Sequence, residues 1–226
     1  MTAKPQHLTM ASRTLTAETV RERSLLAGVL LFILGSSFLT LTMLAASVAP
    51  AYDFNRAAIS DLGVIDGTAL VFNSLLVTVG VLNIAGGYLL YRSHGRVAIL
   101  ALYVLAGVGS AGAGFVPLDV SDLHALFALF GFVFFNLEAL GTGLILRSPM
   151  RVISAAAGLV GLAYVVVMVI GDGGSPAVFG VIGHGGSERM IVYPAMLWTI
   201  VFGGYLMAGG AVRRTDTARN DAARSS

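Results

Sequence analysis

Five side chains that could do acid–base or ligand chemistry lie beside long apolar runs of this sequence. They are Asp61, His124, His184, Glu188 and Arg189. They occur in three short polar segments, which read "ISDLG" (59–63), "GFVPLDVSDLH" (114–124) and "GHGGSERM" (183–190). If the three segments meet at one depth, these side chains form a single polar pocket.

A metal-dependent hydrolase is one chemistry that this set could support. His124, His184 and Asp61 would supply zinc ligands and leave a coordination position open for water. Glu188 would then act as the general base, and Arg189 would hold a phosphate or carboxylate. No two of the ligands share a short H-x-x-x-H type spacing, so the spacing alone does not define a zinc site. No cofactor is evident from the residues, and zinc is the one that this ligand set would allow.

A structural role is the alternative reading of the same residues. Asp61 or Glu188 could pair with Arg56 or Arg189 and clamp the loops together, because loops at a membrane must satisfy their own polar groups. A pocket that binds a lipid headgroup, a small molecule or a protein partner without catalysis is a further reading. The residues therefore leave open whether the protein is an enzyme.

The elements that carry these segments are apolar enough to cross a membrane. The chain has 226 residues, of which 56% are hydrophobic and 12% charged, and its mean hydropathy is +0.84. Soluble domains have roughly 25% charged residues, and a spanning helix needs about 20 apolar residues. Six runs meet this length: Leu25–Val48, Ala69–Tyr91, Val97–Val116, Leu123–Leu146, Val152–Gly171 and Met190–Val212. Backbone groups must be paired inside hydrocarbon, so the sequence predicts an all-α, polytopic membrane protein.

Composition also excludes several classes of function. The chain has no cysteine, which excludes disulfides, thiolate metal sites and cysteine nucleophiles. A net charge of +2 gives no basis for nucleic-acid binding. The first apolar run exceeds the ~7–15 residues of a signal-peptide core, so we expect it to be a retained helix. Glycines of the third run, such as Gly107 and Gly109, indicate close helix packing.

The arginines predict the orientation of the chain. Of the 14 lysine and arginine residues, all but Arg56 and Arg189 fall on one side of the six runs. The positive-inside rule then puts both termini in the cytoplasm and makes the protein a multi-pass protein of the cell membrane. We expect a membrane domain at 24–212 between disordered cytoplasmic tails at 1–23 and 213–226.

The three polar segments also carry a resemblance to a known family. "ISDLG", "GFVPLDVSDLH" and "SERMIVYPAMLW" occur in this order at the ends of apolar runs. In this respect the chain resembles the domain-of-unknown-function 998 (DUF998) family of prokaryotic multi-pass membrane proteins. The resemblance implies a compact multi-helix membrane domain. It implies no activity, substrate or catalytic residue.

One carboxylate, Glu138, lies inside the fourth apolar run. A charge near the bilayer centre costs ~2.5–3.5 kcal/mol, so this side chain needs a partner. At ~1.5 Å per residue, Glu138 lies about 13 Å from Arg147 at the cytoplasmic end, and Asn83, Tyr103 and Tyr205 lie at similar depth. We expect one of these three to donate a hydrogen bond to Glu138. The layer would act as a polar staple between helices or as part of a proton or cation relay.

The sequence thus predicts a binding or accessory protein of the lipid bilayer, with a polar pocket or loop clamp on its extracytoplasmic face. The alternatives are a metal-dependent hydrolase of that face using His124 and His184, and a small proton-coupled transporter using Glu138.

Overall fold

The computed structural model describes residues 6–212, and it describes side chains from residue 18 onward. In this part of the chain, six helices are long and apolar enough to cross a membrane. They are α1 (Gln6–Val48), α2 (Ala69–His94), α3 (Val97–Phe115), α4 (Leu123–Gly143), α5 (Met150–Asp172) and α6 (Gly183–Met207). Two short 3₁₀ helices, η1 (Ser60–Gly63) and η2 (Pro176–Ile182), lie in the connections. The predicted all-α architecture is confirmed, with six long apolar helices that could span a membrane.

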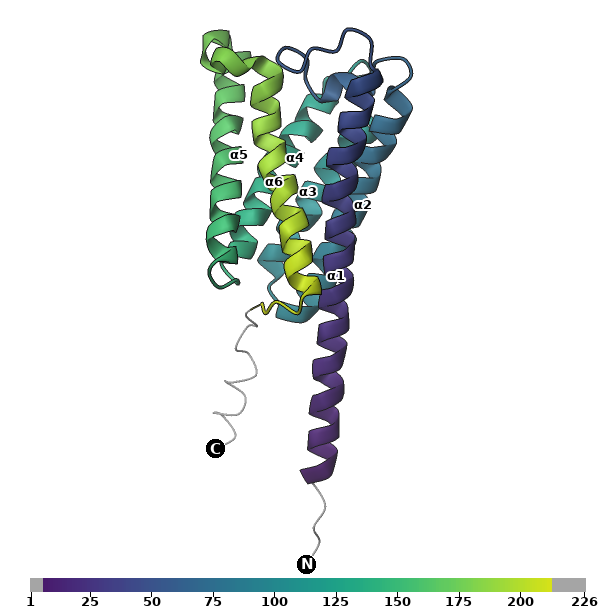
Figure 1. Ribbon diagram of the computed structural model, residues 1–226, viewed down its shortest axis with the longest axis vertical. Coiled ribbons are helices and arrows are strands. Elements are labelled where there is room, and N and C mark those ends of the chain that lie inside the picture. Colours follow the sequence, from purple (N-terminus) through teal and green to yellow (C-terminus); the bar gives the residue numbers. More distant parts are fainter. Residues whose placement is uncertain (1–5, 213–226) are drawn as a thin grey trace, which may run out of the picture.

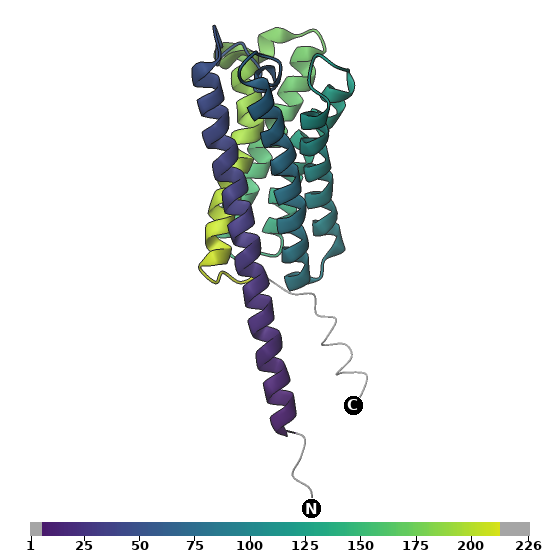
Figure 2. The same ribbon diagram turned by 90° about the vertical axis from the view of Figure 1, so that its right-hand side faces the viewer.

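The helices form a ring in the order of the sequence. Each helix packs against the next, α6 closes the ring against α1, and α4 also contacts α6 across the interior. Successive helices run in opposite directions, so α1 begins and α6 ends at the same end of the bundle (Figures 1 and 2). We call this the terminal end. The opposite end, which carries the connections 49–68, 116–122 and 173–182, is the distal end.

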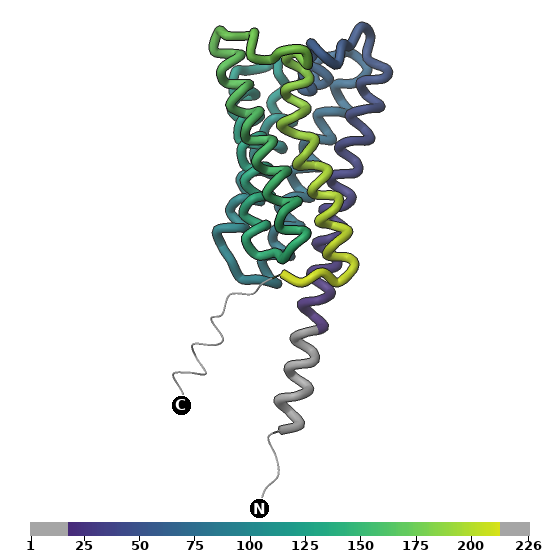
Figure 3. The backbone as a smooth tube through the Cα atoms, turned by 60° about the vertical axis from the view of Figure 1, so that its left-hand side comes forward, coloured from purple at the N-terminus to yellow at the C-terminus, as the bar shows by residue number. Residues whose placement is uncertain are grey.

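Helix α1 is longer than the sequence predicts. It begins at Gln6 and continues below the terminal end of the bundle (Figure 1). Figure 3 shows α1 from residue 18 onward, where it packs beside α6. Extending an existing helix avoids the costly nucleation step, and the segment before Leu25 contains good helix formers such as Ala, Leu, Glu and Arg. The predicted tail at 213–226 lies outside the described residues.

Glycines let neighbouring helices approach at backbone distance. A Cβ atom added to Gly80 of α2 would meet the carbonyl oxygen of Gly107 on α3, and one added to Gly107 would meet that of Gly80. Gly28 of α1 and Gly203 of α6 face each other in the same reciprocal way. The predicted packing role of the glycines is therefore confirmed, and it brings polar groups of different helices within hydrogen-bonding reach.

Candidate functional site

The connection between α1 and α2 is held to the start of α6 by Arg189. Its Nη1 donates to the carbonyl oxygens of Phe54 at 2.9 Å, Ala57 at 3.2 Å and Gly185 at 2.7 Å. Its Nη2 donates to the hydroxyl of Tyr52 at 2.6 Å. The planar guanidinium suits this task because it presents several donors in a fixed fork. Arg189 is 8% exposed, so the clamp lies inside the fold.

Tyr52 completes this contact. Its hydroxyl donates to the carbonyl oxygen of Ala58 at 2.7 Å while it accepts from Arg189. Burial raises the pKa of Tyr52 to about 12, and the guanidinium of Arg189, which lowers it, offsets only part of that effect. The guanidinium also lies 4.7 Å from the ring centroid of Phe54 and 5.6 Å from that of Tyr52, a cation–π arrangement.

Glu188 holds the same connection from the adjacent position of α6. Its Oε2 accepts a hydrogen bond from the backbone N–H of Ile59, immediately before η1, and the side chain is 4% exposed. The sequence predicts that Asp61 or Glu188 forms an ion pair with Arg56 or Arg189 and so clamps the loops together. The structure instead uses backbone N–H and carbonyl groups as the partners of Glu188 and Arg189.

The other two members of the expected ion pairs have local partners. Arg56 is highly exposed, and its Nε lies 3.8 Å from Oδ2 of Asp53. Oδ2 of Asp61 accepts from the backbone N–H of Ala58 at 2.9 Å and so stabilises its own turn. Asp61 therefore shapes η1 and takes no part in the ion pairing expected for it.

His124 faces the end of α3 with one ring nitrogen. Nδ1 lies 2.8 Å from the carbonyl oxygen of Val116 and 3.2 Å from that of Ala113, where the last carbonyls of α3 lack helical partners. A carbonyl oxygen only accepts, so these contacts assign the hydrogen to Nδ1 and leave Nε2 as an acceptor in the neutral ring. The side chain is 2% exposed, and Nε2 has no hydrogen-bond partner among the described residues.

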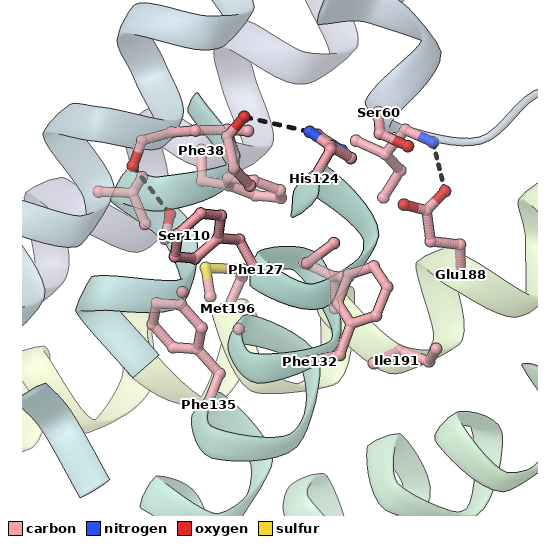
Figure 4. Close-up of a pocket in the computed structure, with 18 of the residues that line it drawn as sticks. Phe38, Ser60, Ser110, His124, Phe127, Phe132, Phe135, Glu188, Ile191 and Met196 are labelled. Atoms are coloured by element: carbon pink, nitrogen blue, oxygen red, sulfur yellow. Dashed lines mark hydrogen bonds between the residues drawn. The ribbon is translucent and has the colours of Figure 1, made fainter. Parts of the chain in front are cut away.

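An apolar cavity of about 70 Å³ lies between the helices in the distal half of the bundle. Its lining includes the apolar side chains Phe38, Phe72, Phe127, Phe132, Phe135 and Met196. A second, more polar cleft at the distal end is lined by Asp61, Asp172 and His184. Cavity and cleft share Ser60, His124, Ala128, Phe132 and Glu188. Figure 4 shows His124, Ser60 and Glu188 on the side toward the connections, with the phenylalanine rings of α4 below them.

The cleft does not have the geometry of the expected zinc site. Nε2 of His184 lies 3.2 Å from Oδ1 of Asp172, and Asp61 is bonded to its own turn. Among the residues that the structure describes, no three His, Asp or Glu side chains are placed to hold a metal ion. The zinc site predicted at His124, His184 and Asp61 does not fit this arrangement, because His184 pairs with Asp172 and Asp61 accepts from the backbone of Ala58.

Deeper in the bundle, Glu138 and Asn83 are brought together. Nδ2 of Asn83 donates to Oε2 of Glu138 at 2.7 Å and to the carbonyl oxygen of Tyr103 at 3.1 Å. The hydroxyl of Tyr103 lies 3.2 Å from Oγ1 of Thr142. All four side chains are fully buried. Tyr205 does not belong to this layer: α6 ends at Met207, and the Tyr205 hydroxyl donates to the carbonyl oxygen of Ala211.

Comparison with known proteins identifies the family. The profile described as "Protein of unknown function (DUF998)" matches residues 25–205. The chain belongs to the DUF998 family. The matched region includes the clamp, the cavity and the buried polar layer. No curated protein and no solved structure matches the chain.

Three residues of this DUF998 protein were not singled out from the sequence. Tyr52 bonds Arg189, Asp172 pairs with His184, and Thr142 bonds Tyr103. A signal for Thr142 is present, because it follows Glu138 by four residues and therefore shares its face of α4. The sequence gives no comparable signal for Tyr52 and Asp172, because their partners lie far along the chain or across a connection, in helix α6.

Proposed function

We propose that this DUF998 protein binds a small amphipathic molecule at its extracytoplasmic face. The apolar part of the ligand would occupy the cavity, and its polar head would lie at the junction with the cleft. The observation that carries the proposal is the junction itself. His124 and Glu188, both almost fully buried, line the apolar cavity and the polar cleft at once.

The charge distribution supports an outward-facing distal end. Among the residues that the structure describes, the arginines other than Arg56 and Arg189 lie at or beyond the terminal end, which the positive-inside rule assigns to the cytoplasm. The distal connections are rich in aspartate, including Asp61 and Asp119, and Asp172 ends α5 at the same end of the bundle. The cleft therefore opens toward the outside in this proposal.

The size of the cavity limits the ligand. An engineered cavity of ~150 Å³ admits benzene, and the present cavity has about 70 Å³. A flexible chain segment of a few carbons fits this volume better than a ring, and because the cavity is not fully enclosed, the rest of a longer chain would extend beyond it. Lipid is as apolar as the cavity, so transfer of the chain from the bilayer provides little driving force. Selectivity must then come from the head and from the shape of the cavity.

The clamp supports binding because it fixes one wall of the site. Ile59 and Ser60 of the α1–α2 connection line the cavity, and Glu188 and Arg189 hold this connection to α6. A preformed wall lowers the ordering cost that a ligand must overcome. Glu138 does not line the cavity and is bonded to Asn83, which favours its role as a staple over a place in a transport path.

The proposal is tested by filling the cavity. Gly131 of α4 lines it, and a Cβ there meets other atoms only at 3.7 Å or more. We expect purified protein in lipid nanodiscs to bind 1-octanol in a calorimetric titration, and Gly131→Leu to lose this binding. Gly204→Leu is the matched control, because a Cβ at Gly204 meets nothing within 4 Å. Equal binding by the wild type and Gly131→Leu, with both folded, would refute the proposal.

A further inference from the structure

The junction between cavity and cleft contains one acceptor without a partner. Nε2 of His124 is buried and has no hydrogen bond within the described residues, while Nδ1 is fixed by the carbonyl of Val116. A buried polar atom without a partner destabilises the folded protein, because it has lost its hydrogen bonds to water. The ring cannot turn to satisfy Nε2 without giving up the contact of Nδ1 with the end of α3. An acceptor held in this way is suited to a donor brought in by a ligand.

The other charged groups around the junction exclude an anionic head. Asp61, Asp172 and Glu188 line the cleft, and a carboxylate or phosphate would face their like charges. Arg189, the nearest buried cation, already directs its guanidinium nitrogens to carbonyl oxygens and to Tyr52. The cleft also contains Arg56, but its side chain is highly exposed and lies beside Asp53. An anion would therefore gain no desolvated cationic partner.

An ammonium head is also disfavoured at this position. The junction borders an apolar cavity, where a buried charge pays a large desolvation cost. The carboxylates that could offset this cost have partners: Glu188 bonds Ile59, Asp61 bonds Ala58, and Asp172 pairs with His184. An uncharged hydroxyl carries one donor for Nε2, and its burial costs much less.

We infer that the head of the ligand is an uncharged alcohol whose hydroxyl donates a hydrogen bond to Nε2 of His124, with its apolar chain in the cavity. This inference rests on the proposed binding function and names its ligand class. His124 is the residue that distinguishes an alcohol from an acid of equal chain length.

The test compares three amphiphiles of one chain length. Wild-type protein in nanodiscs is titrated at pH 8 with 1-octanol, octanoate and octylamine. The key variant is His124→Asn, whose side-chain amide can still donate to Val116 as Nδ1 does but places no acceptor at the position of Nε2. We expect the wild type to bind 1-octanol tightest and His124→Asn to bind it roughly 3- to 10-fold more weakly, the effect of one lost hydrogen bond. The affinity for octanoate should differ little between the wild type and His124→Asn.

The possible results separate this inference from the proposed function. Unchanged 1-octanol binding by His124→Asn, or tightest binding of octanoate or octylamine, overturns the alcohol assignment, while sensitivity to Gly131→Leu still supports the cavity. Absence of binding by any amphiphile overturns the proposed function instead. If His124→Asn does not fold, ¹⁵N-histidine NMR of the wild type decides: 1-octanol should shift the Nε2 resonance of His124, and an unshifted resonance overturns the inference.

Discussion

Asn83 of α2 donates a hydrogen bond of 2.7 Å to the carboxyl group of Glu138 of α4, and both side chains are fully buried between helices that could span a membrane. The same amide also donates to the carbonyl oxygen of Tyr103 on α3. One side chain thus links three helices at a single depth, which is the arrangement of a polar staple.

The staple predicts different effects for two substitutions of Glu138. Glu138→Gln keeps an acceptor for Asn83 and should leave the free energy of unfolding nearly unchanged. Glu138→Leu removes the acceptor and should destabilise the fold by about 0.6–2 kcal/mol. Unfolding in lipid bicelles measures both, and a double-mutant cycle with Asn83→Leu isolates the pair. A Glu138→Leu protein as stable as the wild type would contradict the staple.

The clamp predicts that lysine cannot replace Arg189. Lysine keeps the charge but lacks the planar fork that reaches the carbonyls of Phe54, Ala57 and Gly185. In Arg189→Lys, we expect amide hydrogen exchange of the 49–68 connection to become at least several-fold faster. Arg56→Lys is the control, since Arg56 is exposed. Equal protection in both variants would show that the guanidinium geometry does not hold the connection.

The contact of α3 with α4 predicts an asymmetry between two glycines that face each other. A Cβ at Gly109 would meet the backbone of Gly131, whereas a Cβ at Gly131 would make only ordinary contacts. Gly109→Ala should therefore destabilise the bundle by about 1–3 kcal/mol, the usual cost of overpacking. Gly131→Ala should be neutral or slightly stabilising. Thermal unfolding of the two variants tests this, and a reversed order would mean that the helices approach differently.

Tyr52 predicts a loss of stability in alkali. Its pKa is raised to about 12 in the folded protein, while an unfolded tyrosine has a pKa near 10. The folded state then keeps a proton that the unfolded state releases, so this contribution is complete below pH ~10 and declines as the pH rises toward 12. The free energy of unfolding should fall more steeply over this range in the wild type than in Tyr52→Phe. Parallel curves would contradict the buried, neutral phenol.

The fold was predictable because the hydropathy and length of an apolar run indicate a helix that could span a membrane. Four of the predicted starts or ends coincide with helix boundaries: Val48 for α1, Ala69 for α2, Val97 for α3 and Leu123 for α4. The depth of a residue, estimated from its distance along the chain to the end of its run, was a less reliable guide to its hydrogen-bond partners. Tyr205 was assigned to the Glu138 layer by depth alone, but the early end of α6 at Met207 puts it in the last turn.

The sequence indicated which residues lie close together at the candidate site, but it did not indicate their hydrogen-bond partners. Asp61, His124, His184 and Glu188 do line one distal cleft. Their charges suggested ion pairs and metal ligation, whereas Glu188 and Arg189 bond backbone groups of the α1–α2 connection. Every residue except proline has the same backbone carbonyl and N–H groups, so the sequence does not indicate which of them will accept or donate a bond to a side chain. The cavity is likewise a product of side-chain packing among five helices and has no sequence signature.

Cysteine labelling at Ser60 tests the central claim most directly. The native chain has no cysteine, and Ser60 lines both the cavity and the cleft. In intact cells, a membrane-impermeant maleimide should label Ser60→Cys, and 1-octanol should slow this labelling. Two controls belong to the measurement. Asp53→Cys, at the exposed distal surface, should be labelled at a rate that 1-octanol does not change, and Arg147→Cys, at the terminal end, should react only after permeabilisation.

The account predicts rapid, octanol-protected labelling of Ser60→Cys from outside the cell. Labelling of Ser60→Cys only after permeabilisation, or at a rate indifferent to 1-octanol, would contradict an outward-facing binding site at the junction of cavity and cleft.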